Sequence, residues 1–349
     1  FWIVAAIGLG LFALASLSLT QTKDRPGGKQ VSSEAQQPPG WAQVDRLVSE
    51  QKFEEAARAT EKLRLAAQKA GDRDEWTRAL IKEVQLRTGL HGYETAVRFL
   101  KEQAWPDGPL NRAALNLFYA RSLVNYYQSY SWEINQREKV ESRGSVDLKV
   151  WTKDQIYAEA QRAYEEVWKQ RVAMGTEPVS RLGEFLDRNN YPEGIRSTLR
   201  DAISYLYVEL LADTSLWTAQ ESNEIYRLDL KTLLTPIQRE VPLLDAAVHP
   251  LTKACFILGD LEHWHAQNRR RGAALEARLE RLERLHAAFT GASDRAAIAA
   301  DLAKLLPEYR DVSWWATGKA KQAEFLREGD QPNKLVRART IAEEGWKAY

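Results

Sequence analysis

Long stretches without proline constrain the fold of this chain more than any other feature of its sequence. Proline is absent from residues 40–105, 110–177 and 251–306. Glycine and proline together make up 31 of 349 residues (19 + 12), about 9%, whereas average usage is roughly 12%. Folds made of many short strands need frequent turns, while long helices exclude proline from their interiors. The sequence therefore predicts an all-α fold.

Composition excludes several classes of protein. The chain is 44% hydrophobic and 28% charged, which is typical of globular proteins and not of disordered ones. Its formal net charge of +1 provides no overall attraction to nucleic acid, so a nucleic-acid partner is not expected. Cys255 is the single cysteine, which rules out an intrachain disulfide and any zinc site built from several cysteines.

The first 22 residues carry no charge. Phe1–Leu19 is nearly all apolar or small, and about 20 such residues can cross a bilayer core of ~30 Å as a helix. Residues 1–22 are therefore predicted to be a transmembrane anchor. A cleaved signal segment is the alternative, because Ala13-Leu14-Ala15 fits the small-x-small cleavage pattern. Both interpretations export the rest of the chain.

The following segment differs sharply in composition. Residues 23–40 are rich in Pro, Gly, Ser and Gln, with Val31 as the only large apolar residue, which predicts a flexible linker. Helical periodicity begins at Trp41 and continues to the end of the sequence. We therefore expect a helical repeat domain over 41–349, and a subdivision of it near 215–250 is left open.

An internal echo indicates how the helices stack. The hexapeptide Phe53–Arg58 (FEEAAR) is repeated as Tyr93–Arg98 (YETAVR), 40 residues later. A small alanine inside such a helix allows a neighbouring helix to approach closely, and the aromatic residue fills the space between successive pairs. The echo predicts an irregular α-solenoid of stacked, tetratricopeptide-like helix pairs.

Two further expectations concern the second half of the chain. Residues 250–289 read as continuous helix, and the leucines at 275, 279, 282 and 285 alternate with charges, which predicts one long exposed helix. Ser131–Lys153 is the least regular stretch after the linker, and we expect an ordered loop pinned by Trp132 and Trp151. Other helices are expected at 53–70, 74–88, 93–103, 111–130, 154–173, 196–213, 223–234, 294–306, 313–327 and 334–348.

The sequence offers little that resembles chemistry. His263 and His265 have Asp260 and Glu262 nearby, but residues two apart on a helix point about 200° apart, so a metal site is not expected. The arginines at 269–271 are expected to form a solvated turn or helix face. Cys255 has apolar neighbours, and we expect a buried structural thiol.

Catalytic and cofactor motifs are missing from the sequence. It contains no nucleophile elbow, HExxH motif, phosphate-binding loop or dinucleotide fingerprint, so we expect neither an enzyme nor a cofactor. The tryptophans are the unusual feature. They could line a groove for an extended partner, but their helical spacing favours the filling of gaps between stacked helices.

One stretch resembles a known family. Asn125–Asn135 (NYYQSYSWEIN), followed by Trp151, is similar to the N-terminal helical region of bacterial alpha-2-macroglobulin family proteins. The similarity extends to Trp41–Asp45, Arg196–Asp201 and Lys334–Tyr349. The resemblance marks five residues as candidates for partner binding: Tyr126, Tyr127, Trp132, Asn135 and Trp151.

The resemblance implies an exported scaffold. Such proteins are large, secreted or membrane-anchored, and carry helical repeats ahead of macroglobulin β-sandwich domains, with which many entrap proteases. A Cys-x-Glu-Gln thioester is not present here, because Cys255 is followed by Phe-Ile-Leu. The chain would thus be the N-terminal tether and interaction scaffold of an alpha-2-macroglobulin-like protein of the bacterial cell envelope, anchored in the inner membrane facing the periplasm or secreted. Its partners would be the downstream macroglobulin domains, proteases or a cell-envelope protein. A stand-alone exported tetratricopeptide-like adaptor is the alternative.

Overall fold

The structure is a computed structural model that describes residues 39–138, 146–186, 189–235 and 239–348. These residues form α-helices and short 3₁₀ turns with no β-strand, which confirms the predicted all-α class. None of the helices in this part of the chain combines the length and apolar character needed to cross a bilayer. The predicted membrane segment, residues 1–22, and the linker as far as residue 38 lie outside the described residues.

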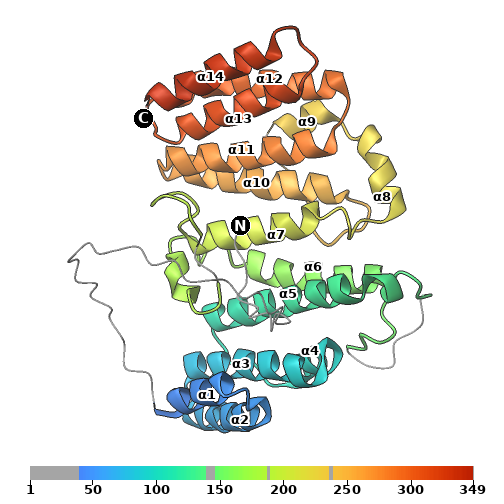
Figure 1. Cartoon of the computed structure of the whole chain (residues 1–349), viewed down its shortest axis with the longest axis vertical. Coiled ribbons are helices and arrows are strands. Elements are labelled where there is room, and N and C mark those ends of the chain that lie inside the picture. Colours follow the sequence, from blue (N-terminus) through green and yellow to red (C-terminus); the bar gives the residue numbers. More distant parts are fainter. Residues whose placement is uncertain (1–38, 139–145, 187–188, 236–238, 349) are drawn as a thin grey trace, which may run out of the picture. The chain divides into compact units, whose positions relative to one another are not determined.

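Helices follow one another with short connections along most of the chain (Figure 1). Their bounds are α1 Pro39–Ser49, α2 Phe53–Ala70, α3 Arg73–His91, α4 Tyr93–Glu102, α5 Pro109–Ile134, α6 Lys153–Trp168, α7 Leu199–Ala212, α8 Ala219–Glu224, α9 Leu230–Leu234, α10 Pro250–Gln267, α11 Arg271–Ala288, α12 Ala292–Leu305, α13 Trp315–Glu328 and α14 Lys334–Ala348.

The chain divides into two compact bodies. The described part of the smaller body comprises residues 39–111 and 146–149, and the larger body contains the rest from residue 112 onward. The division therefore falls at the beginning of α5, whereas the stretch near 215–250 lies inside the larger body.

The smaller body contains both copies of the repeated hexapeptide. Each copy begins a helix, α2 or α4, and its central alanine, Ala56 or Ala96, is fully buried. Each copy also forms the same ion pair one turn apart, Glu54 with Arg58 at 4.0 Å and Glu94 with Arg98 at 2.9 Å. The echo thus marks helices with equivalent packing.

A third copy of the hexapeptide lies in the larger body. Residues 157–162 (YAEAQR) in α6 share the aromatic, alanine and arginine positions, while the acid lies one position later, at Glu159. Ala160 is fully buried, like the two alanines before it. Sequence analysis missed this copy because its spacing of 64 residues from the second differs from the 40 residues between the first two.

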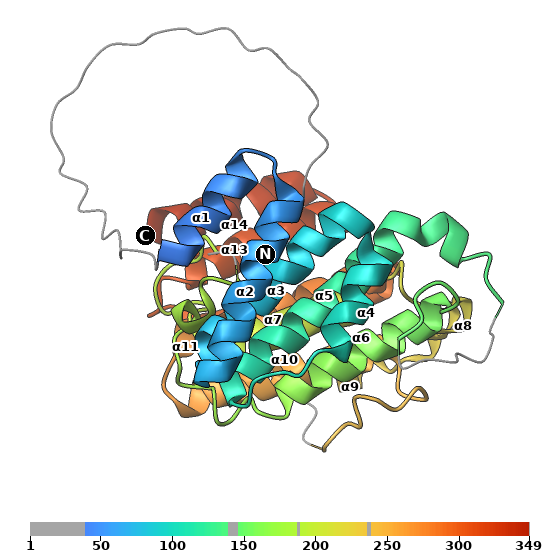
Figure 2. The same cartoon turned by 90° about the horizontal axis from the view of Figure 1, so that it is seen from below.

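Helix α7 is the central helix of the larger body. Twelve of its fourteen residues are buried, because α7 packs against both α6 and α10. The neighbouring helices α5 and α6 lie side by side (Figures 1 and 2), and the Tyr119 hydroxyl of α5 donates a hydrogen bond to Glu159 Oε1 of α6 at 2.9 Å. A helix buried all round is typical of the core of a large helical layer structure.

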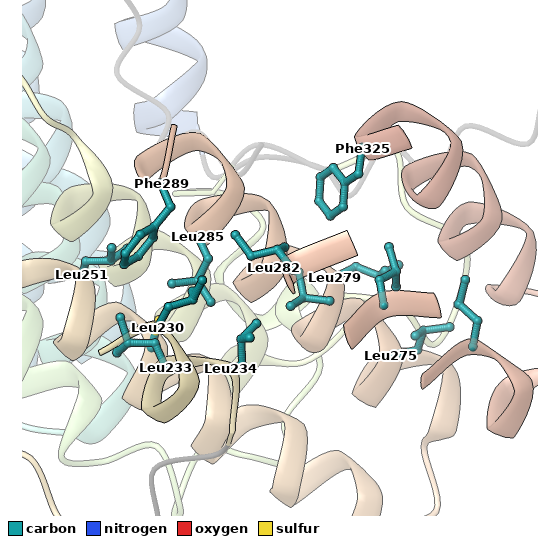
Figure 3. Packing of buried hydrophobic residues seen from close by; sticks show 14 of the residues in the cluster. Leu230, Leu233, Leu234, Leu251, Leu275, Leu279, Leu282, Leu285, Phe289 and Phe325 are labelled. Atoms are coloured by element: carbon teal, nitrogen blue, oxygen red, sulfur yellow. The ribbon is translucent and has the colours of Figure 1, made fainter. Parts of the chain in front are cut away.

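The predicted long exposed helix over 250–289 is wrong in two respects. The chain turns at residues 268–270, where Arg269 adopts a left-handed φ of 58°, so α10 and α11 form a hairpin. The leucines of α11 are also buried. Figure 3 shows them in one packed cluster with Leu230 and Leu233 of α9 and Phe325 of α13.

The predicted helix over 223–234 is interrupted. The chain here forms α8, a 3₁₀ turn and α9 instead of one helix. Asp229 is the N-cap of α9, because its side chain accepts a hydrogen bond from Lys231 N. This side-chain cap competes with continuation of the preceding helix.

Most tryptophans fill gaps between helices, as predicted. Of the eleven tryptophans among the described residues, five are buried, four are half-buried, and two, Trp132 and Trp346, are exposed. The buried ones are Trp41, Trp151, Trp168, Trp217 and Trp315.

Candidate functional site

The five residues marked by the resemblance lie around the C-terminal end of α5. This helix kinks at Tyr130, whose φ of −124° and ψ of 22° are not helical. Tyr126 and Tyr127, one turn before the kink, are about 95% buried, and burial raises the pKa of Tyr126. The two tyrosines therefore serve packing and hydrogen bonding within the fold.

Arg137 holds this region together. Its Nη2 donates to Glu133 Oε1 at 2.7 Å and to the Tyr126 hydroxyl at 3.2 Å, and its Nη1 donates to the carbonyl oxygen of Trp151 at 2.9 Å. The arginine thus links the end of α5 to the chain that enters α6. Sequence analysis did not single out Arg137, although its spacing of four from Glu133 is a signal for an ion pair.

Tyr127 adds a second link. Its hydroxyl donates to the carbonyl oxygen of Ser215 at 3.1 Å and lies 3.5 Å from Asn135 Oδ1. The hydrogen-bonded group at the end of α5 thus has two parts: Arg137 joins Tyr126 to Trp151, and Tyr127 contacts Asn135 and Ser215.

Trp132 does not belong to this group. It lies in α5 with 80% of its surface exposed, whereas Trp151 is 7% exposed. Both tryptophans were predicted to pin a loop. Trp151 is buried, as that role requires, but Trp132 is exposed, so the prediction is wrong for Trp132. An indole this exposed contributes nothing to the core of the described body.

A groove opens where α5 ends and where α6 and α8 begin. Both helices start with a capping box, in which Thr152 pairs with Gln155 and Thr218 pairs with Glu221. Lys153 Nζ donates to the carbonyl oxygen of Trp217, which holds the two helix starts together. The groove is lined by Ile134, Asn135, Arg137, Thr152, Lys153, Asp154, Gln155, Ala158, Thr218 and Ala219. Most of the lining residues are polar, but carbon atoms provide the larger share of the exposed lining surface, which suits an amphipathic peptide segment.

Two other cavities adjoin along α5, α7 and α11. They share Glu209 and Arg284, and Glu209 lies 3.8 Å from Arg121. Burial raises the pKa of Glu209. The Tyr205 hydroxyl in the lining is buried and makes no hydrogen bond among the described residues.

The histidines that resembled metal ligands point apart, as predicted. His263 is exposed, while His265 is 1% exposed and its Nε2 lies 2.7 Å from Asp201 Oδ1. The prediction of a partly exposed helix face is wrong at His265. Asp260 is occupied by Arg171 and Arg200, so it is not available to a metal. In the described part of the chain no group of three ligand-type residues could hold a metal ion.

The neighbouring arginines and the cysteine lie where the sequence predicted. Arg269 and Arg271 are at the turn into α11, and both are exposed. Cys255 is 1% exposed in α10, and burial raises the pKa of its thiol to about 12.

The raised pKa predicts an unreactive thiol. Because the thiolate is the reacting form, we expect the folded chain to resist iodoacetamide at pH 8 and the urea-unfolded chain to react fully. The folded pKa exceeds the ordinary value of 9.0, so the associated stability is present below pH 9 and is lost as the pH rises towards 12. Mass spectrometry of the labelled protein measures the reaction, and rapid labelling of the folded chain would contradict the expected burial.

No protein-family model, curated protein or solved structure matches this chain. The macroglobulin resemblance therefore rests on its sequence motifs.

Proposed function

We propose that this chain is a non-enzymatic scaffold of tetratricopeptide-like helix pairs that binds a protein partner. The three copies of the hexapeptide support stacked pairs, since α2, α4 and α6 each follow a partner helix and each bury the same alanine. Repeated helix pairs of this kind form an irregular α-solenoid, whose extended surfaces suit protein recognition. Nucleic acid remains an unexpected partner because the net charge is +1.

Trp132 is the observation that carries the proposal. Its indole is 80% exposed in the last turn of α5, and the end of this helix borders the groove at the start of α6. Tryptophans that a partner covers contribute strongly to protein interfaces, because they bury a large apolar surface and lose little conformational freedom. The partner segment would cover Trp132 and place its backbone polar groups along the groove.

Replacement of Trp132 by alanine tests this site. We expect at least about a tenfold loss in the amount of partner recovered from cell-envelope extract, because an anchoring tryptophan contributes about 2 kcal/mol or more. Helicity and thermal stability should stay unchanged, since the side chain is exposed. The readout is quantitative mass spectrometry of proteins captured by the full chain.

Tyr226→Ala provides the control. This residue is 82% exposed in the 3₁₀ turn between α8 and α9, so it reports the general effect of removing an exposed aromatic ring. A partner that binds the Trp132→Ala variant as well as the parent chain would contradict the site.

The proposal has a finer form that follows from the family resemblance. We propose that the chain is exported to the bacterial cell envelope, is anchored through residues 1–22 in the inner membrane or is secreted after their cleavage, and positions downstream macroglobulin domains. Proteases or a cell-envelope protein are then the external partners. The coding sequence after Tyr349 tests this form, because it must encode β-sandwich domains. Mass spectrometry of the mature N-terminus distinguishes an anchor from a cleaved signal.

A stand-alone exported adaptor is the second candidate. It is favoured by the two cavities along α5, α7 and α11, which share Glu209 and Arg284 and would hold neighbouring parts of an extended peptide. Two results distinguish the candidates. The adaptor retains its partner when no downstream domain is present. In the adaptor, Glu209→Ala weakens the binding and Trp132→Ala does not.

A further inference from the structure

Helix α14 packs on α13 through one narrow face. Gly345 is essential to this contact, because a Cβ atom there would lie 2.9 Å from Lys319 Cβ and 3.2 Å from the carbonyl oxygen of Ala316. Ala338, two turns earlier, is buried on the same side, and Lys319 Nζ pairs with Glu344 at 2.8 Å. The other faces of α14 are therefore turned away from α13.

One of these faces is apolar and exposed. Leu335 is 64% exposed, Val336 is 67% exposed and Trp346 is 84% exposed. Successive residues of an α-helix are rotated by about 100° around its axis. The three side chains therefore share an arc that covers roughly 100° of the circumference, and Ala342 lies about 20° outside this arc. Large apolar side chains gathered on one helix face indicate an interaction surface.

Two opposite charges lie in the middle of the same face. Arg339 and Glu343 form an ion pair at 2.7 Å along the helix, with 81% and 46% of their side chains exposed. They stand two residues before and two residues after Ile341. Val336 and Trp346 likewise stand five residues before and after Ile341, so the exposed face has the same spacing in both directions.

We propose that α14 pairs in an antiparallel arrangement with α14 of a second copy of this chain. The two-fold axis crosses the helix pair at the level of Ile341. This arrangement places Arg339 opposite Glu343 of the other copy and Val336 opposite Trp346, and each of these contacts forms twice in the dimer. A parallel pair would instead place like charges opposite each other, which is unfavourable. The charge pattern therefore selects the antiparallel arrangement, as an isologous interface requires.

The dimer is weak. A helix of 15 residues is about 22 Å long, and its exposed face offers less than the roughly 1,200 Å² of total buried surface found in stable complexes. We expect association on the order of 10–100 µM, in the range of transient interfaces. This inference is independent of the proposed function, because it involves neither Trp132 nor the grooves.

Cysteine cross-linking of the full chain tests the pairing. Ala342 lies one residue along the helix from the level of the proposed axis and is exposed at the edge of the apolar face, so a short bis-maleimide reagent should link Ala342→Cys to its copy in the dimer. Ala303→Cys on α12 is the matched control, since it places the same change on an exposed helical position away from α14. Cys255 adds little background because it is buried. Equal cross-linking of both variants, or none at Ala342→Cys, would overturn the proposal.

Charge reversal tests the orientation. In the Ala342→Cys background, R339E alone places carboxylates opposite carboxylates, and E343R alone places guanidinium groups opposite guanidinium groups. Each should reduce the cross-linked yield by at least about fivefold, because like charges face each other twice. An equal mixture of the two variants should restore the yield through mixed dimers, in which every acid meets a base. A mixture that cross-links no better than either variant would refute the antiparallel pairing, and unchanged circular dichroism confirms that α14 remains folded.

Discussion

Replacement of Glu83 by alanine is expected to destabilise the smaller body by about 3–5 kcal/mol, because it leaves a buried arginine without its counter-charge. Glu83 in α3 is fully buried. Its Oε2 accepts a hydrogen bond from Arg64 Nε of α2 at 2.7 Å, and its Oε1 accepts from Arg87 Nη2 at 2.7 Å. Arg64 is itself only 6% exposed, so water cannot replace the lost carboxylate.

The same carboxylate also organises the contact with α4. The guanidinium groups of Arg64 and Arg87 lie 5.8 Å and 3.9 Å from the ring centre of Phe99. Loss of Glu83 therefore disturbs three helices at once. Hydrogen exchange of the α2 and α3 peptides is the suitable measurement, because a chain with two bodies does not have one well-defined free energy of unfolding.

Two further variants separate charge from packing. Glu54→Ala removes an exposed carboxylate that lies 4.0 Å from Arg58 on α2, and we expect a change within about 0.5 kcal/mol. The double variant Arg64→Met, Glu83→Leu removes both buried charges and should recover much of the stability lost in Glu83→Ala. Faster exchange in the double variant than in the single one would contradict this explanation.

Replacement of Asp201 by alanine should destabilise the larger body by about 3–5 kcal/mol, because one carboxylate satisfies three buried donors. Its Oδ2 accepts hydrogen bonds from Thr198 N at 2.9 Å and from Thr198 Oγ1 at 2.8 Å. Its Oδ1 lies 2.7 Å from His265 Nε2 of α10, and both residues are 1% exposed. Asp201 thus closes the start of α7 and joins α7 to α10.

The loss combines two known effects. A helix cap contributes about 0.5–2 kcal/mol, and a buried imidazole without its partner costs a further 1–3 kcal/mol or so. Urea unfolding followed by tryptophan fluorescence and by hydrogen exchange in α7 measures the change. Asp154→Ala is the control, because Asp154 is an exposed acid in the first turn of α6 and its removal should cost less than about 1 kcal/mol. Similar losses in both variants would show that the buried contacts of Asp201 contribute little.

Local signals were sufficient to predict where most helices begin and end. Gly71 ends α2 with a left-handed φ of 71°, a conformation that glycine adopts without strain. Thr152 and Thr198 begin α6 and α7 through capping boxes formed with residues only three positions away. Such interactions involve neighbours in sequence, so they can be read without knowledge of the fold.

The candidate site was only partly predictable for the same reason. The aromatic residues near the end of α5 stood out in the sequence, but their burial did not. Trp132 and Trp151 differ in exposure, 80% against 7%, because the former follows the kink at Tyr130 and the latter packs beside the start of α6. Lys153, which joins the starts of α6 and α8, gave no sequence signal, because its bond to the Trp217 carbonyl connects residues 64 positions apart.

The sequence by itself determined the helical class, the approximate positions of the helices and the alanines at which helix pairs approach each other. The tertiary structure alone decided which charged faces are covered. In α11 the leucines and charges predicted an exposed helix, yet the leucines are buried, and Arg281 on another side is completely buried and pairs with Glu262 at 2.8 Å. Periodicity records that a helix has an apolar face, but burial of its polar face depends on whether a second neighbour brings a complementary charge, and that neighbour lies far away in the sequence.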